Sequence, residues 1–165
     1  MSRIEEMLSR MGLALPERCT PRGAFLPYRR EGSLVFMAGQ ICEWNGNVPV
    51  TGPVLRAGET APAGIAAVDI DAGKKGAQIC ALNLLFHLKA AAGGDLDRLE
   101  NVVRLGGFVQ CLPGFDASPA VLNGASDLLI ALYGEAGRHA RTAVGVSGLP
   151  ANASVEVDAI FRLKD

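Results

Sequence analysis

The residues best suited to chemistry lie near the end of the chain, where an arginine precedes a strand that carries carboxylates. In the stretch RTAVGVSGLPANASVEVDAIFRL, which begins at Arg141, the apolar residues of 155–163 alternate with polar ones. This alternation predicts a half-buried strand with Glu156 and Asp158 on its outer face. A guanidinium matches a carboxylate through two parallel hydrogen bonds, so Arg141 is a candidate anchor for a small acid, and Glu156 is a candidate for orienting a water. The alternative is a surface arginine beside a solvated carboxylate.

An antiparallel pair of strands is one way to bring these groups together. RTAVGV reads as a strand, and the GLPAN that follows it has the composition of a turn. We therefore predict that 141–146 folds back onto 155–163, which places Arg141 near its partner strand or a neighbouring chain. His139 lies two residues before Arg141 and shares its cleft if the strand begins that early. The alternative for His139 is an exposed loop position.

Three stretches of the chain resemble the RidA/YjgF family of reactive-intermediate (imine/enamine) deaminases. The pattern R-T-A-V-G-V-x-x-L-P-x-x-A-x-V-E-V-x-A-I, from Arg141, is similar to the C-terminal signature of that family. GSLVFMAGQ, from Gly32, resembles its Gly-x-x-hydrophobic-x-x-Ser-Gly-Gln. A weaker match covers Gly114–Tyr133, with Asn123 in a helix after a short loop. Together the matches run in the family's order over most of the chain from Phe25 onward.

The resemblance implies an α+β fold of the kind shared with a bacterial chorismate mutase. This fold has a mixed, largely antiparallel sheet with two long helices on one face, and it assembles as a homotrimer with clefts between subunits. The apolar periodicity agrees, since it predicts a helix capped by Asp71 and ended by Gly93, and a second from Ser118 to about Tyr133. Helices on one face of an alternating sheet satisfy the burial pattern. The predicted strands outside 141–163 are 25–30, 34–38 and 102–112.

The resemblance also implies roles for individual residues. In the family, the motif arginine holds the substrate carboxylate, and the motif glutamate helps to activate a water that hydrolyses the C=N bond. These catalytic positions are Arg141 and Glu156 here. Ala38 stands where the family often has Ser. The expected substrate-binding residues are Phe25, where the family commonly has Tyr, Tyr28, which is the other source of a hydroxyl, Gly39, Gln40, Asn123, and Ala143, where Cys is frequent.

The function that the resemblance implies is cofactor-free hydrolysis of small reactive imine or enamine acids, of the 2-aminoacrylate type, to keto acids and ammonia. The expected partners are a small carboxylate-bearing metabolite and further copies of the chain. One alternative is a non-catalytic small-molecule-binding or regulatory trimer, to which the departures at residues 25, 38 and 143 point. Another is a ribonuclease or translation inhibitor. The net charge of −1 and the absence of a dense basic block argue against nucleic acid as a partner.

Length and composition favour one domain spanning 1–165, with 1–22 as an N-terminal helical extension. The four cysteines are scattered without a CxxC pair, as is typical of reduced thiols in a cytoplasmic protein. No glycine-rich phosphate loop or metal-spaced cluster occurs, so neither cofactor nor metal is expected. No apolar run reaches the roughly 20 residues of a membrane-spanning helix, so no membrane association is expected.

Overall fold

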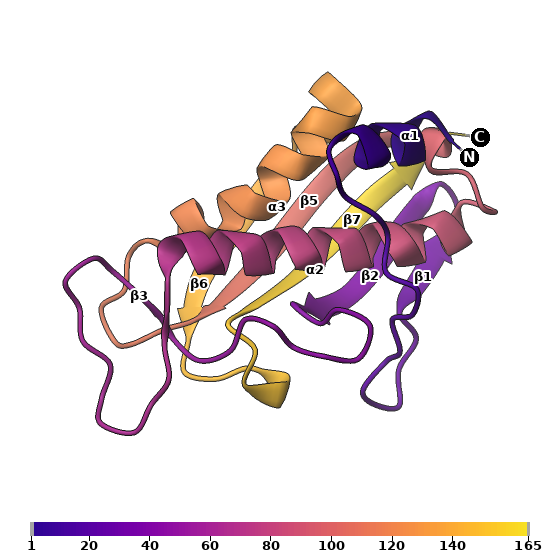
Figure 1. The fold of residues 1–165 in the computed structure, drawn as a ribbon. Coiled ribbons are helices and arrows are strands. Elements are labelled where there is room, and N and C mark those ends of the chain that lie inside the picture. The colour runs from indigo at the N-terminus through magenta and orange to yellow at the C-terminus, as the bar shows by residue number, and fades with distance from the viewer. Residues whose placement is uncertain (1, 165) are drawn as a thin grey trace.

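A five-stranded sheet with helices on one face forms the frame of the molecule (Figure 1). The computed structural model describes residues 2–164. Its helices are α1 (Arg3–Arg10), α2 (Ile70–Ala91) and α3 (Ser118–Tyr133), with short 3₁₀ turns at 96–98, 134–137 and 150–152. Its strands are β1 (Tyr28–Glu31), β2 (Leu34–Ile41), β3 (Val54–Leu55), β4 (Val68–Asp69), β5 (Leu99–Gln110), β6 (Ala140–Val146) and β7 (Val155–Leu163). The predicted α+β class is therefore confirmed.

The strands of the sheet lie in the order β1-β2-β7-β5-β6, and only the β5–β6 pair is parallel. The predicted pairing of 141–146 with 155–163 is wrong, because β5 lies between these two strands. The turn after β6 passes through a 3₁₀ turn in which Ala151 and Asn152 have positive φ. The chain then enters the middle of the sheet, where the inner face of β7 is fully buried. A strand with so apolar an inner face gains more from a central place than from an edge.

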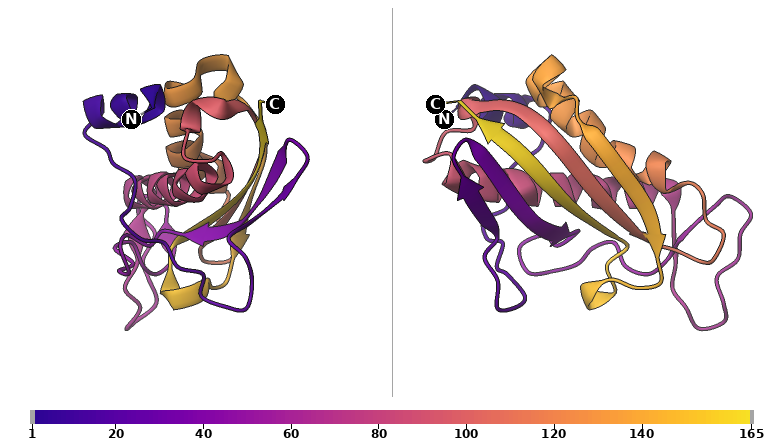
Figure 2. Two further views of the ribbon diagram at one scale, coloured as in Figure 1. Left: turned by 90° about the vertical axis from the view of Figure 1, so that its right-hand side faces the viewer. Right: turned by 180° about the vertical axis from the view of Figure 1, so that it is seen from behind.

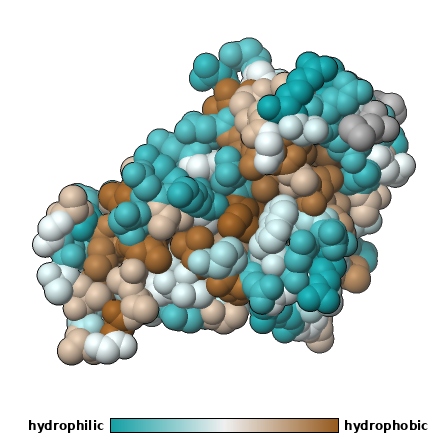
Figure 3. Space-filling model, viewed as in Figure 1, coloured by the Kyte–Doolittle hydropathy of each residue, from teal (hydrophilic) through white to brown (hydrophobic). Residues whose placement is uncertain are grey.

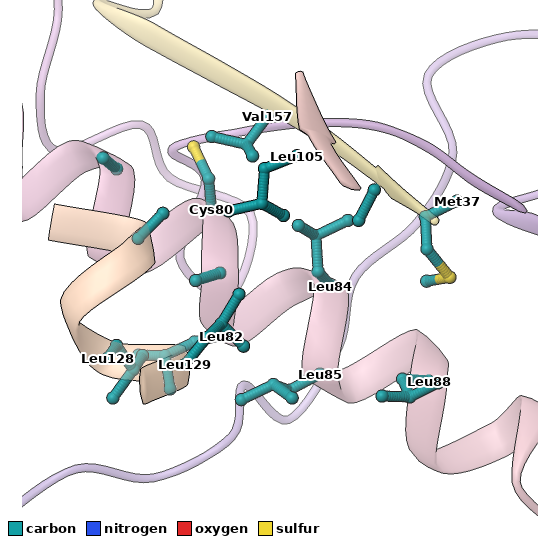
Figure 4. Packing of buried hydrophobic residues seen from close by; sticks show 14 of the residues in the cluster. Met37, Cys80, Leu82, Leu84, Leu85, Leu88, Leu105, Leu128, Leu129 and Val157 are labelled. Atoms are coloured by element: carbon teal, nitrogen blue, oxygen red, sulfur yellow. The ribbon is translucent and has the colours of Figure 1, made fainter. Parts of the chain in front are cut away.

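Helices α2 and α3 cover one face of the sheet, and the other face is left open (Figure 2). Figure 4 shows Cys80 and Leu84 of α2 pointing toward the sheet, where Leu105 of β5 and Val157 of β7 lie. Gly107 of β5 allows the close approach of α3, because a Cβ there would overlap the side chain of Leu122. The core thus fills the space between the two helices and the sheet, as the apolar stripes predict.

The ends of several elements differ from the predicted ones. Asp69, not Asp71, caps α2, and its side chain accepts a hydrogen bond from the N–H of Ala72 at 2.7 Å. Of the predicted helical extension over 1–22, the described residues 2–22 contain only one helix, α1. Its Ile4 and Leu8 are fully buried, so the helix is part of the core.

Three properties of the surface concern membrane-spanning helices, apolar groups and hollows. Within residues 2–164, no helix combines the length and apolar character needed to cross a membrane. Hydrophilic and apolar residues are intermixed on the helix-covered face, and one group of apolar residues lies in its middle (Figure 3). An open hollow of about 620 Å³ lies beside α1 and α2, and the ion pair of Lys89 with Glu5 (Nζ to Oε1, 2.7 Å) lines it. The candidate residues of the sequence analysis are not among its lining residues.

Candidate functional site

Arg141 lies at the start of the edge strand β6, and its guanidinium is held against α3. One terminal nitrogen donates to Oδ1 of Asn123 at 2.9 Å and to Oγ of Ser126 at 3.0 Å. The other donates to the carbonyl of Pro119 at 3.1 Å. A guanidinium has five N–H groups, so two remain after the described residues are bonded. The side chain is therefore fixed in direction and still has donors for a ligand.

The charge of Arg141 has no carboxylate partner in the described part of the chain, since none of the ion pairs among residues 2–164 includes it. All three of its acceptors are neutral groups. A half-buried guanidinium without a counterion binds a small carboxylate or phosphate strongly when one reaches it. This arrangement is what an anion-binding site requires.

Glu156 lies on β7 and lines a cavity of about 220 Å³, and Arg141 is not among the residues that line it. Burial raises the pKa of its carboxyl above the usual value, and the charge of nearby Asp158 raises it further. A carboxylate with a raised pKa is a better proton acceptor from water than an exposed one. The predicted residues Phe25, Gly39 and Gln40 line the same cavity, with further lining from Cys19, Thr20, Pro21, Arg22, Ile41, Glu43, Asn83 and Pro150.

The walls of this glutamate cavity are tied together by side-chain contacts. The thiol of Cys19 donates to Oε1 of Gln40 at 3.1 Å, and Nε of Arg22 donates to Oε2 of Glu43 at 2.8 Å. Burial raises the pKa of the Cys19 thiol to about 11, and the charge of Glu43 contributes to the shift. Cys19 is thus a neutral thiol at physiological pH and a poor nucleophile. Its contact holds the segment before β1 over the end of β2.

Arg141 and Glu156 lie on opposite faces of the sheet within one chain. Arg141 pairs with Leu105 of β5, and Glu156 pairs with Phe108 of the same strand. Paired residues point to the same face and successive residues alternate, so positions 105 and 108 point in opposite directions. Leu105 is buried under the helices, which places Arg141 on the helix side. Glu156 is on the open face, which is toward the viewer in the right-hand view of Figure 2.

The predicted site residues therefore form two groups. Asn123 joins Arg141, and Ala143 lies on the same side, packed against the core. Phe25, Gly39 and Gln40 join Glu156. Tyr28 packs against the core and does not line the glutamate cavity, so it does not replace the hydroxyl that Phe25 lacks there.

Sequence reasoning missed several residues around both groups. Ser126 contacts Arg141 from the buried side of α3, and a serine within an apolar helical stripe was the available signal. His139 contacts Ser126 from the turn before β6, which begins only at Ala140, so the early strand start on which the prediction for His139 depended is not observed. Cys19 and Arg22 lie in a segment without regular structure, where no periodicity marks them. Within residues 2–164 no cluster of three or more His, Cys, Asp or Glu residues is placed to hold a metal ion.

Apolar side chains extend across the open face of the sheet. Phe36 of β2 pairs with Ile160 of β7, and Phe108 of β5 pairs with Val144 of β6. Phe36 and Val144 are 44% and 41% exposed, and the other two are half-buried. These four residues, here called the open-face patch, span four adjacent strands. The ion pair of Arg104 with Asp158 lies between the two apolar pairs on the same face. The patch therefore consists of two separate apolar pairs, and we take exposed apolar side chains of this size as a candidate interaction site.

Comparison with known proteins gives similarity over almost the whole chain. The family described as "YjgF/chorismate_mutase-like, putative endoribonuclease" matches residues 5–162. Protein TCP17 of Trypanosoma cruzi is 37% identical over 164 residues, which are 99% of this chain and 96% of that protein. The structure of Atu1372 from Agrobacterium tumefaciens, a protein described as of unknown function, is 38% identical with a TM-score of 0.82, over 97% of this chain and 91% of that one. A structure from Shewanella oneidensis MR-1, described as a putative endoribonuclease, is 30% identical with a TM-score of 0.84, over 97% and 99%.

Proposed function

The chain belongs to the RidA/YjgF family, and we propose on this premise that it hydrolyses small imine or enamine acids, of the 2-aminoacrylate type, to keto acids and ammonia. The observation that carries the proposal is the guanidinium of Arg141, which three neutral acceptors orient and no described carboxylate neutralises. A substrate carboxylate supplies the missing anion. The reacting carbon of a 2-imino acid is bonded directly to that carboxylate, so Arg141 also fixes the position of the C=N bond.

The chemistry requires one water and one group that moves protons. An enamine first takes a proton from solvent on carbon to become the iminium ion. Ionised Glu156 then accepts a proton from the water as the water oxygen bonds to the iminium carbon, which gives a neutral carbinolamine. The same carboxyl returns that proton to nitrogen and then accepts the hydroxyl proton as the C–N bond breaks, so the keto acid leaves, and the last proton passes to ammonia. Positioning and general base catalysis are sufficient for this sequence, and none of its steps uses a cofactor.

The active site in this proposal combines two copies of the chain. Because Arg141 and Glu156 of one chain lie on opposite faces of the sheet, one copy supplies the arginine group and its neighbour supplies the glutamate cavity. The open-face patch supports association, since it leaves Phe36 and Val144 exposed in the single chain. Two different surfaces that meet head to tail form a ring when the rotation between neighbours closes, and we propose a closed homotrimer with three such clefts.

A binding protein without turnover is the second candidate. Phe25 lines the glutamate cavity and carries no hydroxyl, so a polar contact that could orient water is absent at that position. In this version the trimer captures a small keto or amino acid through Arg141 and does not hydrolyse it. The names of relatives also suggest ribonuclease activity as a candidate function, but the net charge of −1 does not favour an RNA-binding surface.

The test is to generate 2-aminoacrylate in situ and to measure the rate of pyruvate formation with and without the protein. The proposal expects acceleration by wild type, none by Arg141→Ala, and wild-type rates for Arg10→Ala, whose side chain is 78% exposed on α1. A wild-type rate equal to that of buffer overturns the enzymatic proposal. Stabilisation by pyruvate or serine in a thermal shift assay, without turnover, then selects the binding protein.

We also propose a cytoplasmic location. All four cysteines are free, and two of them, Cys42 and Cys80, are buried. Reduced thiols are typical of that compartment. Imine and enamine acids are short-lived in water, so a protein that hydrolyses them has to be present where they are released.

A further inference from the structure

A chain of hydrogen bonds leads away from Arg141 into the protein. The guanidinium donates to Oγ of Ser126 at 3.0 Å, and Oγ of Ser126 lies 2.9 Å from Nε2 of His139. On the other side of the ring, Nδ1 of His139 lies 2.7 Å from the carbonyl oxygen of Gly137. Ser126 is only 7% exposed, so bulk water does not replace these contacts. Four groups from α3, β6 and the turn before it are thus joined.

The direction of each hydrogen bond in this series follows from its two end groups, the carbonyl of Gly137 and the guanidinium of Arg141. A carbonyl oxygen only accepts, so Nδ1 of His139 carries the proton. In a neutral imidazole Nε2 is then the acceptor, and the hydroxyl hydrogen of Ser126 points to it. The lone pairs of Ser126 are left for Arg141, which only donates. Burial lowers the pKa of His139, the hydrogen bond to Gly137 opposes this in part, and the positive charge of Arg141 lowers the pKa further, so the neutral ring is favoured.

We propose that Ser126 and His139 are positioning residues that fix the guanidinium of Arg141 for a ligand carboxylate. The inference rests on the proposed function in one respect, namely that Arg141 binds the carboxylate. An arginine side chain has about 2 kcal/mol of rotamer entropy to lose, and a ligand that meets a fixed guanidinium does not bear that cost. Without His139 the hydroxyl of Ser126 is free to rotate, and its hydrogen can turn toward Arg141. His139 therefore acts on the ligand through the orientation of Ser126.

Binding measurements test the proposal with matched variants of α3. Ser126→Ala removes the hydroxyl, Ser126→Thr keeps it, and Asp127→Ala changes the exposed neighbour of Ser126 on the same helix. With pyruvate as the probe in titration calorimetry, we expect Ser126→Ala to raise the dissociation constant about tenfold, because a hydrogen bond to a charged group is lost. Ser126→Thr and Asp127→Ala should stay within about twofold of wild type. An unchanged dissociation constant in Ser126→Ala overturns the proposal.

Steady-state kinetics separate positioning from a general loss of structure. We expect Ser126→Ala to raise KM and to leave kcat within about twofold, since the groups that move protons are untouched. His139→Gln retains an acceptor that can reach Ser126 and should recover most of the affinity that His139→Phe loses. A fall in kcat with unchanged KM contradicts the assigned role.

Nitrogen NMR of the free protein gives a result that does not depend on ligand binding. Wild type should show the Nδ1–H tautomer of His139 and guanidinium protons of Arg141 that exchange slowly with water, and Ser126→Ala should lose the slow exchange. If wild type binds no carboxylate but shows both signals, the proposed function fails and the positioning of Arg141 stands. If His139 is the Nε2–H tautomer, the positioning proposal fails whatever the protein binds.

Discussion

Gly39 of β2 and Glu156 of β7 are packed so closely that a side chain at position 39 would displace the carboxylate of Glu156. A Cβ atom there would overlap Oε1 of Glu156 and lie 3.0 Å from its carboxyl carbon. The register of the β2–β7 ladder shifts between Met37 and Gln40, on either side of this glycine. A register shift of this kind redirects side chains beside functional sites. The absence of a side chain at residue 39 thus sets where the carboxylate of Glu156 lies.

Gly39→Ala should therefore displace Glu156 and lower activity. We expect kcat to fall at least tenfold, because a shift of about 1 Å in a positioned group is enough to cost that much. The affinity for pyruvate, which depends on Arg141, should change little. Gly148→Ala is the matched control, since nothing lies within 4 Å of a Cβ at that position. Equal activity of both variants and wild type in the 2-aminoacrylate assay would contradict the role given to this contact.

The raised pKa of Glu156 predicts opposite effects of Glu156→Gln on activity and stability. The folded protein holds this proton more tightly than the unfolded chain does, so ionised Glu156 destabilises the fold. The free energy of unfolding should fall as pH rises from the unfolded value, near 4.5, through the raised folded value. Glu156→Gln should remove this loss and raise the melting temperature at neutral pH.

In the same variant the base is lost, so activity should fall at all pH values. Wild-type activity should decrease as pH falls through the raised pKa, because protonated Glu156 cannot accept a proton from water. Thermal unfolding at several pH values and the pH profile of kcat check the two effects on one pair of proteins. A variant that is less stable than wild type at neutral pH would contradict the assignment of burial as the cause of the pKa shift.

Local sequence patterns predicted which elements form and which face of each element is buried. The alternation of 155–163 and the apolar stripes of α2 and α3 each depend on which face is buried, and each agrees with the structure. The neighbour of β6 was not predictable in this way. Turn residues such as Gly148 and Pro150 indicate that the chain bends, but they do not indicate that β5, more than 30 residues earlier, lies between β6 and β7.

For the candidate site too, sequence patterns pointed to single residues but not to their arrangement in space. The family motifs make Arg141 and Glu156 candidates, but only the register of β5 shows that the two lie on opposite faces. Ser126 has no motif of its own, and its role depends on a contact across 15 residues of sequence. The enclosure of Glu156 by Cys19 and Arg22 depends on a segment without regular structure, whose course is set by tertiary contacts.

The open-face patch predicts that a charge on the uncovered side of the sheet separates the subunits. Val144→Asp places a carboxylate beside Phe108 on the open face, where association would bury it without a partner. We expect sedimentation equilibrium to give a monomer for this variant, with loss of 2-aminoacrylate hydrolysis. Ile65→Asp is the matched control, because Ile65 is also exposed, at 47%, but lies in the loop before β4. A trimeric Val144→Asp protein would show that another surface joins the copies.

Mixed oligomers test directly whether one active site uses two chains. Arg141→Ala lacks the anchor and Glu156→Gln lacks the base, so each homo-oligomer should be inactive. If the variants are unfolded together, mixed in equal amounts and refolded, a cleft is complete when the Glu156→Gln chain supplies the arginine and the Arg141→Ala chain supplies the glutamate. Random mixing makes about a quarter of the clefts complete, and activity should recover to about that fraction of wild type. A site built within one chain predicts no recovery, because every chain in the mixture lacks one of the two groups.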